Sequence, residues 1–244
     1  MKQYNIPQKF QILNGNVLKI IACIAMLLDH AASCLIYQAL YVRGGYFYYG
    51  IDLNELKVIH DVFHTIGTIA FPIFAFLLVQ GFFHTRCRMK YALRLLILGI
   101  ISEIPFNLSL FNELMHPELN NVLFTLLFGF LAIWAWEKFN GRWYIQLPLC
   151  ALMFVAARQL QTDYSWRGVL LIFIFYLLHR WRIPQVLTGL ISMYWKFPSI
   201  IIAFVLLLLY NGERGRQLKY FFYLFYPGHL MLLYLFARCF IKGF

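Results

Sequence analysis

Residues 17–41, VLKIIACIAMLLDHAASCLIYQALY, form an apolar run with Lys19 near its start and the pair Asp29 and His30 in its interior. About twenty apolar residues cross a bilayer as a helix, so this run is long enough to span, and the pair then lies deep inside it. Ionisable side chains at that depth are costly and are kept where they face other helices or a wet cavity. Lys19 and His30 share one helix face, roughly 16 Å apart. We therefore predict that one ligand contacts both.

The composition indicates an integral membrane protein. The chain has 244 residues, of which 62% are hydrophobic and 13% charged, and its mean hydropathy is +0.68. That charge content is about half that of an ordinary soluble domain. Lys and Arg number 21 against 10 Asp and Glu, for a formal net charge of +11. In such a chain basic residues mark cytoplasmic loops, so we expect the lipid bilayer as a partner and no nucleic acid.

Two other readings of the sequence are excluded. The basic N-terminus resembles that of a signal peptide, but the first apolar run is too long and contains Asp29 and His30, so we predict a retained helix. The cysteines form no CxxC pair or His/Cys cluster, so neither a disulfide framework nor a metal site is predicted. They are Cys23, Cys34, Cys87, Cys150 and Cys239.

The rest of the chain predicts an all-α, polytopic membrane helix bundle. After a long outer loop over residues 43–61, further spans are expected at 62–83, 91–110, 121–138, 144–159, 166–178 and 220–241. Basic residues follow the second, fourth and sixth spans, which places the N-terminus in the cytoplasm. Residues 183–210 form either one tilted helix or two short helices broken at Lys196-Phe197-Pro198, because proline interrupts a helix. The total is eight spans, or nine if the break is a reversal, in one domain over residues 1–244.

Several motifs resemble the TraX family. They are LKIIACIAMLLDH at 18–30, GTIAFPIFAFLLVQG at 67–81, HTR at 84–86, YxxRL from Tyr91, ISEIPFN at 101–107, NVxFT from Asn121, Asp163-Tyr, YNGxRG from Tyr210 and FYPGHL at 225–230. The resemblance covers nearly the whole chain. TraX is known as an inner-membrane enzyme that N-acetylates pilin in conjugative systems. It implies a bacterial cytoplasmic (inner) membrane location, acetyl-CoA as co-substrate, and an amine acceptor such as pilin or another peptide.

A wider resemblance is to the transmembrane acyltransferases, in which a polar residue precedes a membrane histidine by eleven positions. Lys19 and His30 occupy the matching positions here, although those families have other polar residues at the first. In those enzymes acetyl-CoA enters from the cytoplasm and the acetyl group reaches an acceptor on the far side. The fold expected is thus transmembrane acyltransferase-like.

The candidate catalytic residues are His30 and Asp29. Acetyl transfer to an amine needs a base, and a neutral imidazole is well suited to accept the proton near neutral pH. Asp29 points about 100° away around the helix, so it is better placed to pair with another helix. Glu103 and Asp163 are alternative acidic partners for His30. We expect direct transfer in a ternary complex, and the sequence leaves an acetyl-histidine intermediate open.

Cations of the cytoplasmic segments are the candidate binding residues for the phosphates of acetyl-CoA, since arginine matches phosphate oxygens bidentately. They are Lys19, Arg86, Arg88, Lys90, Arg94, Arg214 and Arg216. The same loop is also an ordinary topology determinant. Interior polar residues with substrate or structural roles are Glu103, Asn107, Asn121, Asp163 and His229, for which helix caps and kinks are the plainer explanations.

The remaining residues carry less specific predictions. His60, His64, His84 and His116 are expected in loops or at the interface, and the aromatic side chains at the lipid surface. Two other functional classes stay open: a small transporter with a broken helix near Pro198, and a non-catalytic membrane subunit of a conjugation or secretion assembly. The acceptor and the oligomeric state are not readable.

Overall fold

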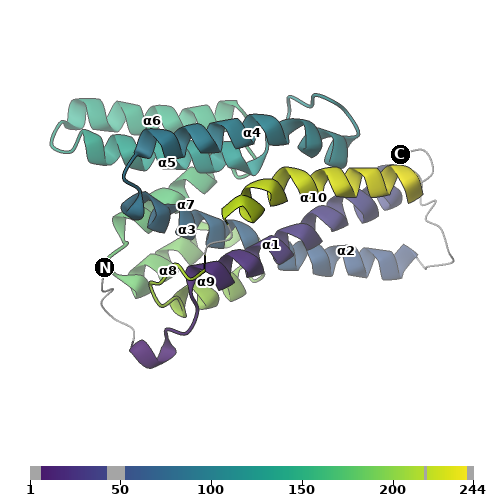
Figure 1. Cartoon of the computed structure of the whole chain (residues 1–244), viewed down its shortest axis with the longest axis horizontal. Coiled ribbons are helices and arrows are strands. Elements are labelled where there is room, and N and C mark those ends of the chain that lie inside the picture. The colour runs from purple at the N-terminus through teal and green to yellow at the C-terminus, as the bar shows by residue number, and fades with distance from the viewer. Residues whose placement is uncertain (1–6, 43–52, 217–218, 241–244) are drawn as a thin grey trace.

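The computed structural model describes residues 7–42, 53–216 and 219–240 (Figure 1). Within these ranges the chain is helical and contains no strand, which confirms the predicted all-α class. The elements are η1 (Gln8–Phe10), α1 (Gly15–Ala31), η2 (Ala32–Val42), α2 (Leu53–Gly67), α3 (Ala70–His84), α4 (Arg88–Phe111), α5 (Val122–Lys138), α6 (Trp143–Gln159), α7 (Ser165–Leu177), α8 (Arg182–Ser192), η3 (Tyr194–Lys196), α9 (Ile201–Leu208) and α10 (Lys219–Phe240).

Three helical segments of the described chain are long and apolar enough to cross a bilayer. They are Gly15–Tyr37, Asn54–His84 and Arg88–Phe111. α7 is apolar but shorter. These segments support a membrane protein, as the composition predicts.

The first span begins at a capped helix end. Asn14 is the N-cap of α1, and its side-chain oxygen accepts hydrogen bonds from the backbone N–H groups of Asn16 and Val17 at 3.1 and 3.0 Å. Such a cap satisfies donors that the first turn leaves unpaired. α1 continues directly into the π-helical segment η2. The predicted run from Val17 therefore corresponds to one continuous helical segment.

The polar segment from residue 52 to 61, expected in an outer loop, is instead mostly helical. From Leu53 onward it forms α2, whose buried Leu56 faces the neighbouring helices while most other side chains are exposed. An amphipathic helix packed against α1 and η2 explains this pattern. α2 and α3 are separated by a short break, because Pro72 has no N–H to donate to the preceding turn. The remainder of the expected outer loop, 43–52, lies outside the described residues.

The region from 183 to 210 takes the broken form that the sequence left open. α8 and α9 are separated by η3 and the turn containing Pro198. With 11 and 8 residues, these helices are only about 16 and 12 Å long, less than the roughly 30 Å of a hydrocarbon core.

α3 is the central helix of the bundle. It packs on α1, α5, α7 and α9, and its side chains Phe76 and Phe82 are fully buried. α4, α5 and α6 lie side by side, and α10 lies between α4 and α1 (Figure 1). The faces of α1, α3, α4, α5 and α10 that meet here enclose the site described next.

Candidate functional site

A cavity of about 650 Å³ lies among α1, α3, α4, α5 and α10. That is within the range of small-molecule sites, about 300–1,000 Å³. One part of its wall is cationic and comes from segments far apart in the sequence. The contributing side chains are Lys19, His84, Arg86, Arg94 and Arg214. Apolar and aromatic side chains make most of the remaining wall.

Two of the cations are held by neighbouring groups. Arg94 donates from Nε to the backbone oxygen of Lys90 at 3.0 Å and from Nη1 to the hydroxyl of Tyr223 at 3.3 Å. The Lys19 ammonium lies over an aromatic ring, 5.3 Å from the centre of Phe222. Both aromatic partners belong to α10, so this helix completes the cationic wall.

Arg214 reaches the cavity because its loop docks on the start of α1. Leu13 exchanges backbone hydrogen bonds with Leu209 and Asn211, and the Gly15 N–H donates to the Glu213 oxygen at 2.7 Å. Gly215 lies in the left-handed region at φ 67°, and a Cβ there would come within 2.5 Å of the Asn14 side chain. The cap of α1 and the loop that carries Arg214 are therefore one unit.

Three of the predicted phosphate-binding cations do not line the cavity. Arg88 instead donates from Nη2 to Glu137 Oε1 at 2.6 Å and stacks over the Phe82 ring. Lys90 and Arg216 are exposed and lie outside the wall. Thus the structure brings together Lys19, Arg86, Arg94 and Arg214 from the predicted set and adds His84, which the sequence assigned to a loop or interface.

Tyrosines line the cavity, contrary to the expectation that the aromatic side chains face lipid. Tyr91, Tyr210, Tyr223 and Tyr226 all contribute to its wall. No sequence signal separates these four from the other tyrosines, since their positions depend on how distant helices pack.

The deep part of the cavity meets a pair of buried histidines. The Tyr226 ring packs edge-to-face with His30, with 6.1 Å between ring centres, and lies 5.8 Å from the His229 ring. His30 Nδ1 and His229 Nε2 are 2.7 Å apart, and the two rings are stacked. Tyr226 lines the cavity, whereas His30 is not part of its wall. The cavity therefore reaches Lys19 and Tyr226, and the expected ligand contact with His30 stays a prediction.

The hydrogen bonds assign the protons of the histidine pair. His229 Nδ1 lies 2.6 Å from the backbone oxygen of Phe225, which can only accept, so Nδ1 carries the proton. In the neutral ring Nε2 is then an acceptor, and His30 donates to it from Nδ1. His30 Nε2 is left with a free lone pair. The sequence predicted an acidic partner for His30, but in the structure its partner is a second histidine, His229. Neither Glu103 nor Asp163 makes a hydrogen bond to His30.

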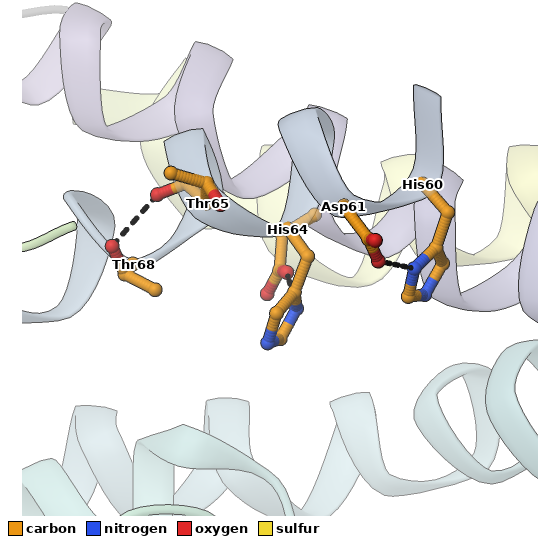
Figure 2. Close-up of polar contacts among 6 residues, drawn as sticks. His60, Asp61, His64, Thr65 and Thr68 are labelled. Atoms are coloured by element: carbon orange, nitrogen blue, oxygen red, sulfur yellow. Dashed lines mark hydrogen bonds and ion pairs between the residues drawn. The ribbon is translucent and has the colours of Figure 1, made fainter. Parts of the chain in front are cut away.

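Asp29 belongs to a separate contact on the other side of α1. Its Oδ1 lies 2.7 Å from His64 Nδ1, which confirms the prediction that it pairs with another helix. Figure 2 shows His64 on α2 with the neighbouring His60–Asp61 and Thr68–Thr65 contacts. A Cβ at Gly67 would approach the Asp29 side chain within 2.3 Å, so the absence of a side chain permits this close packing.

Glu103 and Asn121 form a buried polar bridge between α4 and α5. Asn121 donates to Glu103 Oε2 from its backbone and from its side chain, and caps α5 by accepting from the Leu123 N–H at 3.0 Å. Its side chain also donates to the Gly99 oxygen at 2.9 Å. Among the described residues Glu103 Oε1 and Asn107 Oδ1, one turn further on, have no hydrogen-bond partner. These two oxygens could therefore accept hydrogen bonds from a ligand group that carries several N–H or O–H donors.

Asp163 makes no hydrogen bond to His30 or His229, and it lies close enough to Asp29 and His64 to interact with them electrostatically. Its backbone N–H donates to the Asn120 oxygen at 2.9 Å, which joins the loop before α7 to the segment before α5. Its side chain is exposed.

The fold and the site define a helical membrane-type protein with a cation-lined cavity next to a buried histidine pair. The family model described as TraX protein matches residues 14–237, and the chain belongs to the TraX family. The "Probable fimbrial assembly protein FimC, serogroup H1" of Dichelobacter nodosus is 29% identical over 248 residues, covering 88% of this chain and 92% of that protein. No solved structure matches the chain.

Proposed function

We propose that this protein is a membrane-embedded N-acetyltransferase that uses acetyl-CoA. The observation that carries the proposal is the cavity, whose cations Lys19, Arg86, Arg94 and Arg214 suit phosphates and whose deep residue Tyr226 packs against His30. An elongated thioester with a polyanionic end matches such a site in charge. Arginine binds phosphate oxygens through parallel N–H groups, whereas lysine acts as a point charge.

The chemistry assigned to the histidine pair is general base catalysis. His30 Nε2 takes a proton from the acceptor amine as nitrogen attacks the thioester carbonyl, the carbon–sulfur bond breaks, and the proton passes to the CoA thiolate. His229 keeps His30 in the tautomer with a free Nε2. Such a base contributes on the order of 10²–10⁴-fold to the rate. Transfer is direct, without an acetyl group resting on His30.

The proposed membrane arrangement has eight to nine spans in a bacterial inner membrane, with the N-terminus and the cationic part of the cavity in the cytoplasm. Acetyl-CoA is available on that side, and the cations around Arg86 follow the positive-inside rule. Three helical segments of the described chain are long and apolar enough to span, which supports the membrane location but not the number of spans.

The proposed acceptor is the amine of a peptide N-terminus, with a pilin or fimbrial subunit as the first candidate. The relative named a fimbrial assembly protein supports this choice. Glu103 Oε1 and Asn107 Oδ1 are acceptors without partners among the described residues, and an amine would supply the donors they lack.

The test of cofactor binding compares arginine variants in the purified full-length protein. The Arg86→Ala, Arg94→Ala double variant should bind acetyl-CoA at least tenfold more weakly, since a hydrogen bond to a charged group contributes about 1.5–3 kcal/mol. Titration calorimetry gives the dissociation constant. Wild-type protein should also gain about 2.7 kcal/mol of stability at a hundred times that constant, visible as a higher melting temperature.

The control is Arg142→Ala, which removes one arginine charge from an exposed position outside the cavity wall and is compared with each single variant as well as the double. Its affinity should equal that of the wild type. Arg88→Ala sharpens the comparison, because Arg88 bonds to Glu137 and should affect melting more than binding. Equal affinity in the double variant and the wild type would remove the cations from the site. No binding at millimolar acetyl-CoA would favour a transporter or a non-catalytic subunit.

A further inference from the structure

The Tyr226 hydroxyl is a buried polar group whose hydrogen bonding the described protein leaves incomplete. The residue is 6% exposed; the Val122 N–H can donate toward its oxygen, but its O–H proton has no acceptor among the described residues. An unsatisfied buried hydroxyl costs about 1–3 kcal/mol, so a native structure has a reason to keep one. Here the residue also lines the cavity and packs against His30. A bound molecule that offers an acceptor oxygen would satisfy it.

We propose that the Tyr226 hydroxyl donates a hydrogen bond to the carbonyl oxygen of the acyl donor and stabilises the negative charge that forms there. The inference rests on the proposed acetyltransferase function and adds a catalytic residue to it. The position is suitable, because the phenol lies where the cavity approaches His30, the proposed base. A carbonyl that accepts from Tyr226 would place its carbon near the His30 ring.

The step balances with the groups named. The acceptor nitrogen forms a bond to the carbonyl carbon, the π pair of the carbonyl moves to oxygen, and His30 Nε2 takes the amine proton. The oxyanion accepts the Tyr226 O–H hydrogen bond without taking its proton. When the carbonyl re-forms, the carbon–sulfur bond breaks and the thiolate leaves with the proton from His30. A donor aimed at the developing charge is stronger at a buried position such as that of Tyr226 than in water.

The proposal separates the role of the hydroxyl from the role of the ring. The ring packs between the cavity and the histidines and belongs to the hydrophobic core. The O–H proton has no acceptor within the described protein, so its removal should cost the fold little. Tyr226→Phe keeps the ring and deletes only the donor. Turnover should fall while melting stays near that of the wild type.

The experiment measures kcat and KM for acetylation of an amine-bearing peptide by wild type and Tyr226→Phe. The expected result is a fall in kcat on the order of 10²-fold, the usual effect of removing one oxyanion donor, with KM changed much less. Tyr144→Phe is the matched control, because it deletes a hydroxyl from an exposed tyrosine outside the cavity wall and should leave both constants unchanged. A Tyr226→Phe rate within threefold of the wild type overturns the inference.

A second measurement detects the contact itself. Acetyl-CoA labelled with ¹³C at the carbonyl is bound to each protein, and its carbonyl stretch is recorded by difference infrared spectroscopy. The band should lie at lower wavenumber on wild-type protein than on Tyr226→Phe, where the carbonyl has lost this donor. Identical bands on both proteins overturn the inference even if the variant turns over slowly. Wild type that binds no acetyl-CoA refutes the proposed function and this inference together, whereas an active wild type with an active Tyr226→Phe refutes the inference alone.

Discussion

Asp29 and His30 are neighbours in the sequence, yet they belong to two different sites. Each contacts a histidine of another helix at 2.7 Å: His30 meets His229 of α10, and Asp29 meets His64 of α2. The first pair is buried, whereas the Asp29 and His64 side chains are 27% and 48% exposed. Because consecutive residues on a helix point about 100° apart, α1 separates a buried pair of imidazoles from a half-exposed contact between a carboxylate and an imidazole.

The difference lies in what each contact can contribute. The Asp29–His64 contact joins α1 to α2 within two segments that are long and apolar enough to cross a bilayer. Two buried imidazoles exchange one hydrogen bond in a low-dielectric setting, and that bond selects which nitrogen keeps its lone pair. The outer pair therefore fastens α2 to α1, and the inner pair prepares a base. Substitutions in the His30–His229 pair should therefore lower the acetylation rate, whereas substitutions in the Asp29–His64 pair should affect mainly the packing of α2 on α1.

The largest expected effect follows from His30→Asn. The asparagine amide can still donate toward His229, but the variant has no nitrogen equivalent to Nε2 and so lacks the base. Acetyl transfer should fall by on the order of 10²–10⁴-fold, while acetyl-CoA affinity stays within about threefold of the wild type. Single-turnover assays with labelled acetyl-CoA measure the first quantity and calorimetry the second. A variant that retains more than a tenth of the rate would contradict the role of His30.

The next effect comes from His229, which acts through His30. His229→Ala should lower the rate about 10–100-fold, the usual cost of losing a residue that orients an active group. His229→Gln should recover part of the rate, because its amide oxygen can accept from His30 Nδ1. The matched change in the outer pair, His64→Ala, should leave the rate within about threefold. The pH dependence of kcat should shift in the His229 variants and not in His64→Ala. Equal losses at the two positions would refute the separation.

The sequence predicted the features that local patterns encode. The first span, the all-α class, and the pairing of Asp29 with another helix follow from apolar run length and helix geometry, and the structure confirms them. The break near Pro198 was one of two alternatives, decided by the proline and η3. Extension over one domain remains a prediction, as do the roles of the site residues.

Long-range packing accounts for what the sequence did not show. His229 lies 199 positions after His30, and nothing in either local pattern pairs them. In the same way, Arg88 and Arg94 belong to one basic segment, but Arg88 turns to Glu137 while Arg94 turns to Tyr223. Charge density located the segment, and only the neighbouring helices decide which cations enter the cavity. The polar start of α2 was missed because burial of a single face gives a weak apolar signal.

The smallest expected effect is that of Asp29→Asn, which also tests the sequence-based assignment of Asp29 as catalytic. Asparagine keeps an oxygen that can accept from His64 and removes only the charge, so the free energy of unfolding should change by no more than about 1.5 kcal/mol, the usual contribution of one hydrogen bond. The acetylation rate should stay within about fivefold of the wild type, measured on the same preparations as the melting curves. A loss above about a hundredfold with unchanged melting would instead join Asp29 to the histidine pair. The two sides of α1 would then act as one site, with His64 as the outer member of a chain that reaches His30.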